Sequence, residues 1–462
     1  MISVYNTLSG KKEEFKPIEK GKIRMYVCGP TVYGPAHLGH ARTYVAFDII
    51  RRYLEFMGYE VKFVVNITDI HDDIIKRANE LNINFLELTT KFTENYFRNM
   101  KSLKIKDASI CPKVTDNIPE IIQIVKTLKD KGYAYETEDG VYFNVAKMAD
   151  YGKLSHIKIS KQKTGTRVET DKYEKEEARD FALWKKQKPN EPFWDSPFGQ
   201  GRPGWHIECS ALSTKYLGLQ IDIHGGARDL IFPHHENEIA QSECCFGKKP
   251  FVKYWLHSGF LTVSGQKMSK SLGNYIVVED LLKEYSAEEF RFFIAQSHYR
   301  SPINFSKEEM KKSRNALNGL NEFIQRLLDL QNSGSLSIIK DVNLARKNFI
   351  KEMDSDFNLP KAWVHLFKLE SLINKKIAEG KFTKEDSTCA IQFFKDVDKF
   401  LQVFSFEKKE FELSAEEKSS VEKRNELRNQ KKWEESDEIR QELLKKGIEL
   451  DDTKEGTKWK RI

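Results

Sequence analysis

The chain has 462 residues, of which 39% are hydrophobic and 31% are charged, and its formal charge is 76 − 69 = +7. This length suits three or four domains with a large core, and the modest positive charge permits a polyanionic partner without requiring one. Six cysteines without a regular framework indicate a reducing compartment. Because the sequence has neither a signal-peptide pattern nor an apolar run of about 18 residues, we expect a cytoplasmic protein with no membrane partner.

The N-terminal part has the pattern of a strand, a helix and a second strand. Residues 23–28 form an apolar run, and an amphipathic helix ending at Gly58 is predicted after it. The apolar positions of this helix recur every four residues, at Ala41, Val45, Ile49, Tyr53 and Met57. A second strand at 60–68 completes a βαβ unit, which predicts a parallel sheet, and the helical pattern then continues to about residue 103.

The rest of the chain changes character at several points. Residues 116–200 contain one helix, short alternating strands and a charged stretch rich in Gly and Pro, which together indicate an insertion into the sheet domain. The α/β pattern then resumes over 201–300, and 301–404 is almost entirely helical, as in a helix bundle. We expect a small module at 405–462, with one or two basic helices and a tail containing Gly and Trp.

The stretch 224–243, HGGARDLIFPHHENEIAQSE, has the features of half a metal site. Gly225 and Gly226 predict a turn, and Pro233 suits the start of a helix. His234 and Glu238 are four residues apart and so share a face of that helix. With two cysteines from elsewhere they would make a tetrahedral zinc site, with the candidate ligands Cys28, Cys209, His234 and Glu238. On spacing alone, ordinary helix-surface groups and small core thiols are the favoured interpretation of these residues, since the chain has no CxxC pair.

Two further motifs suit a bound nucleotide. His37 and His40 lie at a predicted helix start, where exposed N–H groups and the helix dipole favour phosphate, and Gly39 lets a flat base approach the backbone. Lysines in KMSKS (267–271) lie on a glycine-bounded loop and can follow charge that develops on a triphosphate. Either motif alone could be an ordinary surface feature. Their order, one after the first strand and one after the last strand of a split sheet, favours a nucleotide site.

These motifs carry a resemblance to a known family. The stretches CGPTVYGPAHLGHAR, NITDIHDD, GWHIECSA, HGGARDLIFPHHENEIAQSE and SGQKMSKSLGN occur in family order, and with them the chain resembles the class I aminoacyl-tRNA synthetases, specifically the cysteinyl-tRNA synthetases. HLGH stands for the family's HIGH motif, with Leu38 in place of Ile. The resemblance implies a split, Rossmann-like nucleotide-binding catalytic domain (1–115 and 201–300) with an inserted connective domain, followed by the helix bundle and an anticodon-binding module. It also maps the family's single zinc ion onto Cys28, Cys209, His234 and Glu238.

The resemblance further implies a reaction and its residues. Cysteine and ATP would form cysteinyl-adenylate, which passes its acyl group to tRNA(Cys), and Mg²⁺ normally accompanies ATP. The implied catalytic residues are His37, His40, Lys267 and Lys270, and ATP binding adds Gly39, Asp229, Met268, Ser269 and Ser271. We expect Thr68, Trp205, His206 and His224 to line the cysteine pocket. Candidates for anticodon contacts are Arg424, Arg428, Trp433, Asp437, Asp451 and Asp452, and we expect a monomer.

Three alternatives share part of this pattern. A related ligase that passes cysteine to a small amine would have the same catalytic motifs, but the long C-terminal extension argues against it. A non-enzymatic RNA-binding protein on a synthetase scaffold would not need intact His37, His40, Lys267 and Lys270. A purely structural zinc protein would not need the KMSKS loop.

Overall fold

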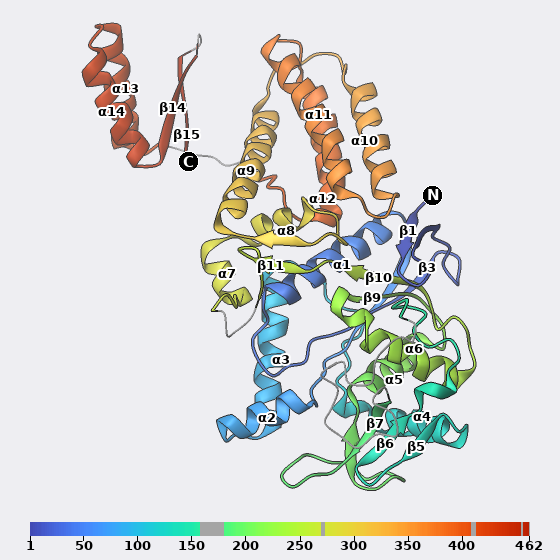
Figure 1. Ribbon diagram of the computed structural model, residues 1–462. Helices are drawn as coiled ribbons and strands as arrows, with labels where there is room; N and C mark the ends of the chain where they lie inside the picture. Colours follow the sequence, from blue (N-terminus) through green and yellow to red (C-terminus); the bar gives the residue numbers. More distant parts are fainter. Residues whose placement is uncertain (158–179, 269–272, 408–412, 454–455, 462) are drawn as a thin grey trace. The chain divides into compact units, whose positions relative to one another are not determined.

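A computed structural model describes residues 1–157, 180–268, 273–407, 413–453 and 456–461. They divide into two compact units, 1–404 and 405–462 (Figure 1), and each unit is described by itself below. Among the helices in the described ranges, none is long and apolar enough to cross a membrane.

A four-stranded parallel sheet is the centre of the first unit. It consists of β3 (Lys22–Val27), β4 (Glu60–Val65), β9 (Ile221–Ala227) and β10 (Val252–Ser258), in the order β10-β9-β3-β4. The predicted parallel sheet is therefore confirmed. The chain runs outward from β3 to β4 on one side and from β9 to β10 on the other. The neighbours β3 and β9 thus form a topological switch point, and open α/β sheets bind ligands beyond the carboxyl ends of their strands at such a point.

The helix expected after the first strand is α1 (Leu38–Phe56), and its four-residue spacing does mark the buried face. Ala41, Val45 and Tyr53 are fully buried, whereas Met57 lies at the C-cap and is partly exposed. The helical pattern expected through residue 103 is interrupted. Asn82 adopts a left-handed conformation (φ +52°) that ends α2 (Asp72–Leu81), and α3 (Phe85–Ser102) then begins at its own Asn cap.

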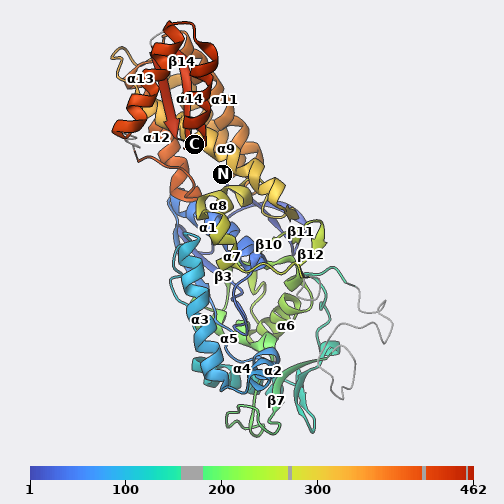
Figure 2. The ribbon, with the colours of Figure 1, turned by 90° about the vertical axis from the view of Figure 1, so that its left-hand side faces the viewer.

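The insertion contains α4 (Ile118–Asp130) and an antiparallel sheet of β5 (Ala134–Glu136), β6 (Gly140–Phe143), β7 (Phe181–Lys186) and β8 (Gly201–Pro203). Its last strand lies just beyond residue 200. The buried Lys185 and Arg202 both donate to Asp72 at the start of α2, so ion pairs fasten this sheet to α2. Within the first unit the insertion lies at the end opposite the helix bundle (Figures 1 and 2).

The predicted turn at Gly225 and Gly226 is wrong, because both residues lie inside β9 and pair with β10. The glycines serve packing instead. A Cβ on Gly225 would lie 2.4 Å from the Phe47 ring, and one on Gly226 would lie 2.8 Å from the His235 ring. The strand thus lets α1 and the helix α6 (His234–Phe246) approach its backbone closely. The helix expected from HIECSALSTKYLG is α5 (Trp205–Leu217).

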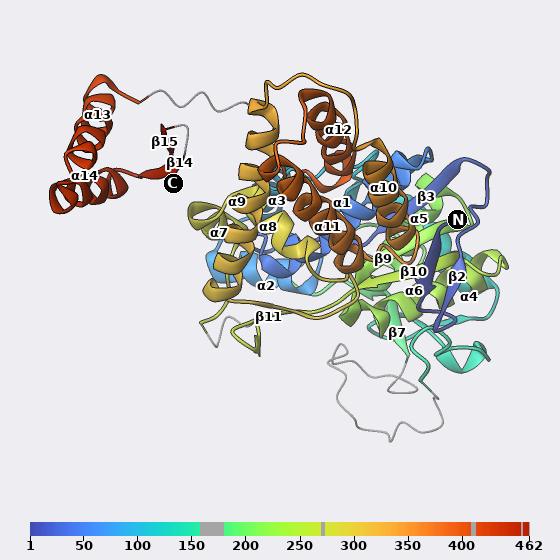
Figure 3. The same ribbon diagram turned by 90° about the horizontal axis from the view of Figure 1, so that it is seen from above.

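Smaller strands and helices surround the sheet. They are the hairpin β1 (Ser3–Asn6) and β2 (Lys11–Glu14), the strands β11 (Leu261–Val263), β12 (Gln266–Lys267) and β13 (Ile303–Phe305), and the helices α7 (Val278–Glu284) and α8 (Ala287–Ala295). The bundle consists of α9 (Lys307–Asp329), α10 (Ile339–Met353), α11 (Leu359–Ala378) and α12 (Lys384–Leu401), seen from above in Figure 3. Helix α1 packs against α8 and α12. The buried Arg291 joins these three helices, donating to Asp48 at 2.7 Å and to the Leu401 carbonyl at 2.8 Å.

The second unit contains α13 (Ala415–Asn429), α14 (Trp433–Lys445) and a hairpin of β14 (Ile448–Thr453) and β15 (Gly456–Arg461). Its small core consists of Leu413, Val421, Leu443, Ile448 and Leu450. The two expected helices are present, but α13 carries as many carboxylates as cations and α14 carries more, so the expectation of basic helices is wrong. The hairpin was not expected, because half of the residues in each of its strands are charged.

Candidate active site

Four buried side chains from three parts of the chain meet at the switch point of the sheet. Cys28 follows β3, Cys209 lies on α5, and His234 and Glu238 share one face of α6. Their potential ligand atoms all lie within 4.8 Å of one another. The distances are 3.9 Å between the two sulfurs, 3.6 Å from Cys28 Sγ to Glu238 Oε1, and 3.1 Å from His234 Nε2 to the same oxygen. The structure thus brings all four predicted metal ligands together.

These distances fit a tetrahedral zinc ion. With Zn–S bonds of about 2.3 Å and Zn–N or Zn–O bonds of about 2.0 Å, ligand atoms should be about 3.3 to 3.8 Å apart. The three separations given above, 3.9, 3.6 and 3.1 Å, fall within or close to this range. Two thiols, an imidazole and a carboxylate are donors that zinc accepts, and the sulfurs disfavour Mg²⁺ and Ca²⁺. The residues present therefore fit the metal that the sequence predicts.

A second group, Cys28, His224, His235 and Glu238, also lies within 4.8 Å, but each of its histidines makes a hydrogen bond to one of the other two residues. His224 Nε2 is 2.8 Å from Glu238 Oε2, which is shorter than the separation of about 3.3 Å expected for two ligands of one tetrahedral ion. His235 Nε2 is 3.2 Å from Cys28 Sγ and 3.9 Å from Glu238 Oε1. We therefore assign His224 and His235 to support of the ligands.

The charges of the cluster suit a divalent cation. Burial alone would raise the pKa of Glu238, but the imidazoles of His224 and His234 outweigh it and hold the pKa at about 2. The hydrogen bond with Cys28 lowers the pKa of the Cys209 thiol to about 6, against the effect of burial. Carboxylate and thiolate thus lie side by side in a pocket shielded from water, where opposite charge is strongly attracted.

The predicted cysteine-pocket residues lie around this cluster. The Trp205 ring is 4.4 Å from the His234 ring, and His206 Nδ1 is 3.0 Å from His234 Nδ1. Since His234 presents Nε2 to the cluster, its Nδ1–H can donate to His206, an outer contact of the kind that orients metal-binding imidazoles. Thr68 donates to the buried Glu208 at 3.2 Å, and its hydroxyl accepts from Asn66 at 3.0 Å.

Three supporting residues were not predicted from the sequence. His235 contacts Cys28, His257 bonds to His235, and Asn66 accepts hydrogen bonds from Tyr26 and from the Gly29 amide next to Cys28. The spacing could have indicated His235 as well as His234, because His235 precedes Glu238 by three residues and therefore also shares a helix face with it. Asn66 and His257 reach the site only through the pairing of the strands.

The histidine pair lies at the N-terminus of α1. His37 is the N-cap and its Nδ1 accepts from the Gly39 amide at 3.0 Å, while His40 Nδ1 accepts from the His37 amide in a reciprocal capping box. Each ring proton must then lie on Nε2, where it can donate to a phosphate oxygen. The two rings stack with centroids 3.8 Å apart. A Cβ at Gly39 would lie 2.8 Å from the His37 ring, so a side chain there would displace it.

The other predicted ATP residues lie in two places. Asp229 is exposed in a short helical turn directly after β9, at the carboxyl edge of the sheet. Lys267 is exposed at the end of β12, and the Met268 methyl would be 3.7 Å from a Cβ on Gly39, which places this methionine beside the histidine pair. Ser269, Lys270 and Ser271 lie outside the described residues.

The terminal module separates its candidate residues into two groups. Arg424 is completely buried and forms a two-pronged ion pair with Asp452, at 2.5 and 2.6 Å. This pair holds the module together, so the prediction that Arg424 contacts RNA does not fit its position. The Trp433 side chain is 54% exposed, with the Arg428 guanidinium 5.6 Å from its ring, and Asp437 and Asp451 are exposed.

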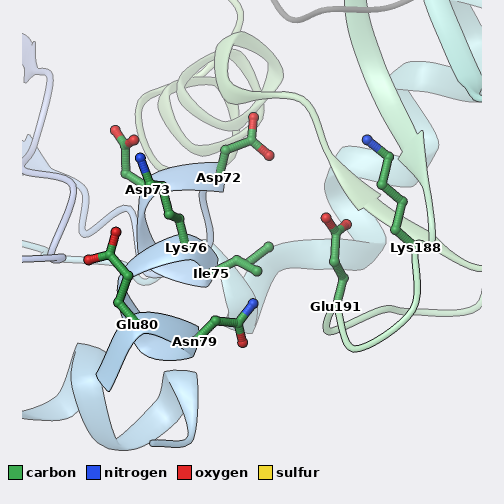
Figure 4. Close-up of a pocket in the computed structure, with 8 residues that line it drawn as sticks. All are labelled: Asp72, Asp73, Ile75, Lys76, Asn79, Glu80, Lys188 and Glu191. Carbon is green, nitrogen blue, oxygen red and sulfur yellow. The ribbon is translucent and has the colours of Figure 1, made fainter. Parts of the chain in front are cut away.

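A separate cleft of about 540 Å³ lies between α2 and the loop after β7 (Figure 4). Lys76 and Lys188 line it together with acidic groups that include Asp73, Glu80 and Glu191. It contains none of the predicted site residues. Its mixed charges belong to the junction that fastens the insertion to α2.

Known proteins resemble the chain over its full length. Residues 14–315 match the catalytic domain of class I tRNA synthetases (C), and 348–406 match a DALR domain. Cysteine–tRNA ligases of Thermococcus gammatolerans and Pyrococcus horikoshii are 51% and 50% identical to it, and that of Methanococcus maripaludis strain C7 is 49% identical; the matches cover 100% of this chain and 99 to 100% of each relative.

Solved structures show the same fold at much lower identity. A methionyl-tRNA synthetase of Mycobacterium tuberculosis, in complex with methionyl-adenylate, aligns with a TM-score of 0.65 at 13% identity, covering 83% of this chain and 91% of the other. With the sheet, the cluster and these matches taken together, the chain belongs to the cysteine–tRNA ligase family of class I tRNA synthetases.

Proposed function

We propose that this protein joins L-cysteine to tRNA(Cys) in two steps, through cysteinyl-adenylate, and that zinc binds the thiolate of the substrate. One observation carries the proposal. The buried cluster of Cys28, Cys209, His234 and Glu238 lies at the carboxyl edge of the sheet. On the helix that begins with the histidine pair, Tyr44, one turn after His40, donates a hydrogen bond to the Cys28 carbonyl at 3.1 Å. A site for a sulfur-containing amino acid and a site for ATP are thus neighbours.

The first step needs positioning and charge stabilisation rather than a protein nucleophile. The cysteine carboxylate attacks the α-phosphate of ATP, and pyrophosphate leaves. His37 and His40 would donate from Nε2 to the α-phosphate, while Lys267 and Lys270, with Mg²⁺, would stabilise the departing pyrophosphate. Removing one such donor typically lowers the rate about 10²- to 10³-fold.

Selection of cysteine over serine requires more than pocket shape, because a swapped small group changes affinity by only about 10- to 200-fold. Bound zinc would prefer sulfur to oxygen and would favour the thiolate at neutral pH. The chain's own residues prepare this preference: His206 orients His234, and His224 holds the free oxygen of Glu238 at 2.8 Å. Trp205, whose ring is 4.4 Å from that of His234, would line one side of the cysteine site. Such discrimination would need no editing domain.

In the second step a ribose hydroxyl at the end of the tRNA accepts the cysteinyl group. The relatives that match the whole chain are named cysteine–tRNA ligases, which supports tRNA over a small amine as acceptor. In the terminal module, exposed Trp433 beside Arg428 suits stacking on an unpaired anticodon base. Asp437 on α14 and Asp451 on β14 offer further exposed acceptors.

Cysteine-dependent exchange of pyrophosphate into ATP tests the first step, with serine as competitor and a zinc chelator as the metal control. We expect exchange with cysteine, little with serine, and loss of exchange on chelation that added zinc restores. Charging of tRNA(Cys) then tests the second step. Exchange without charging would favour a small-amine acceptor, and the lack of exchange would favour a non-enzymatic RNA-binding protein.

A further inference from the structure

A line of buried hydrogen bonds leads from a predicted metal ligand to the N-terminal hairpin. Cys28 Sγ lies 3.2 Å from His235 Nε2, His235 Nδ1 lies 2.8 Å from His257 Nε2, and His257 Nδ1 lies 2.8 Å from the Thr7 hydroxyl. His235 is completely buried and His257 is 4% exposed. Each ring nitrogen in this line therefore has one partner, and each ring bridges two groups.

The direction of these hydrogen bonds follows from the state of Cys28. A neutral imidazole carries one ring proton, so each ring donates on one side and accepts on the other. A Cys28 thiolate that binds a metal has no proton to give, so His235 Nε2–H must be the donor at 3.2 Å. His235 Nδ1 then accepts from His257 Nε2–H, and His257 Nδ1 accepts from the Thr7 hydroxyl. A hydroxyl 250 residues away from His257 in the sequence is thus the first donor of the line.

We propose that Thr7 and His257 are positioning residues that turn His235 into a hydrogen-bond donor to the Cys28 thiolate and keep its Nε2 from competing as a metal ligand. The inference rests on the proposed zinc site. A donated hydrogen bond withdraws charge from the sulfur and fixes its direction, as the outer contacts of metal ligands generally do. It also explains why His235 Nε2 lies at a hydrogen-bond distance from Cys28 Sγ.

The fold holds Thr7 firmly at the end of this line. Its amide donates to the Trp255 carbonyl at 2.9 Å, and the side chain of the preceding Asn6 bonds to the Lys253 carbonyl and the Trp255 amide. The Trp255 ring in turn stacks on His224, with centroids 4.5 Å apart. The hairpin is therefore docked along β10, and the backbone of Thr7 is held where its hydroxyl reaches His257 Nδ1.

Thr7→Val and Thr7→Ser test the hydroxyl, since valine keeps the shape and serine keeps the donor. Purified full-length protein loaded with zinc is mixed with a chromogenic chelator, and the rate of zinc release is measured. We expect release from Thr7→Val to be about 10-fold faster, with Thr7→Ser close to the unmodified protein. In Co²⁺-substituted protein the thiolate-to-cobalt absorption band should shift for Thr7→Val and return for Thr7→Ser. Equal release rates in all three proteins, or equal acceleration in both variants, would overturn the inference.

His235→Gln distinguishes a donor from a ligand, because the glutamine amide can still donate to Cys28. We expect this variant to retain about one zinc per chain, as a donor requires, with faster release. Loss of zinc to the level of Cys209→Ser would make His235 a ligand and overturn the inference. If the unmodified protein binds no zinc, both the proposed zinc site and this inference are wrong. If the protein binds zinc but Thr7→Val releases it at an unchanged rate, only the inference is wrong.

Discussion

At the scale of single residues, Glu238 is the proposed ligand whose charge and two oxygens are both engaged by other groups of the site. It is completely buried, and its two oxygens face His234 at 3.1 Å and His224 at 2.8 Å. Glu238→Gln keeps the size but removes the charge that both imidazoles and a metal would balance. Since loss of a group outside the metal ligands typically lowers metal affinity about 10- to 100-fold, we expect a larger loss here, measured as zinc per chain after dialysis against a weak chelator.

Glu236→Gln is the matched control for this change. Glu236 lies on the same helix, is equally buried, and accepts hydrogen bonds from the Ser155 amide and hydroxyl, each at 2.8 Å, rather than facing the cluster. This variant should keep its zinc and lose roughly 1–3 kcal/mol of unfolding free energy. Equal loss of zinc in both variants would mean that α6 as a whole had been disturbed, and would remove the assignment of Glu238 as a ligand.

A second residue-scale prediction concerns the glycines of β9. Gly225→Ala places a Cβ 2.4 Å from the Phe47 ring on α1, and overpacking of this kind costs about 1–3 kcal/mol of unfolding free energy. Gly319→Ala is the control, because a Cβ there, inside α9, meets nothing within 4 Å, and alanine favours a helix by up to about 1 kcal/mol. The midpoint of thermal unfolding should therefore fall for Gly225→Ala and rise for Gly319→Ala. A lower midpoint in both variants would contradict the packing argument.

The sequence reveals these residues unequally. Periodicity identifies Tyr53 as buried because the pattern reports on one helix at a time, and the motifs identify Cys28 and Glu238 through their family spacing. The same analysis mistakes Gly225 for a turn, because glycine has no side chain that would contribute to a hydrophobic pattern. The strand needs a glycine there because the Phe47 ring, far away in the sequence, packs against its backbone. His257 is missed for the same reason, because its partner is His235. The two meet only because His257 pairs with Gly226 across the sheet and His235 on α6 packs on that glycine.

At the scale of elements, Asp452 joins the terminal hairpin to α13 through ion pairs with Arg424 and Arg428. Arg424 on α13 is fully buried and bonds to both oxygens of Asp452 on β14, which lowers the pKa of that carboxyl well below its usual range. Asp452→Asn leaves the guanidinium buried without its counter-charge, and breaking such a pair costs about 3–5 kcal/mol when both groups are buried. Asp452 is partly exposed, so we expect a smaller loss, read by faster hydrogen exchange over 415–453 in the full chain.

Asp451→Asn is the control on the adjacent position of the same strand. Asp451 is exposed and faces away from Arg424, as successive strand residues do, so hydrogen exchange should not change. The sign of the pH effect follows from the lowered pKa of Asp452. The stabilisation is present above the unfolded value of about 3.9 and is lost as the pH falls toward the folded value. Faster hydrogen exchange in both variants, or an exchange rate in the unmodified protein that does not rise at acid pH, would contradict the stabilising role of the Asp452–Arg424 pair.

At the scale of the whole molecule, the division between residues 404 and 405 separates two tasks. The sheet, the ligand cluster and the histidine pair all lie within 1–404, and the second unit has its own core of Leu413, Val421, Leu443, Ile448 and Leu450. The bundle, by contrast, is joined to the catalytic sheet through Arg291 and α1. Removal of the second unit should therefore leave the first folded, whereas removal of the bundle should not.

Deletion of 405–462 tests this division directly. We expect cysteine-dependent pyrophosphate exchange to stay near that of the full chain, because no residue proposed for adenylate formation is removed. Charging of tRNA(Cys) should fall mainly through a higher KM for tRNA, since exposed residues such as Trp433 would contribute to tRNA binding and not to the catalytic step. Trp433→Ala in the full chain should reproduce part of this loss. Equal loss of exchange and charging on deletion would instead mean that 405–462 is needed for the catalytic unit to fold.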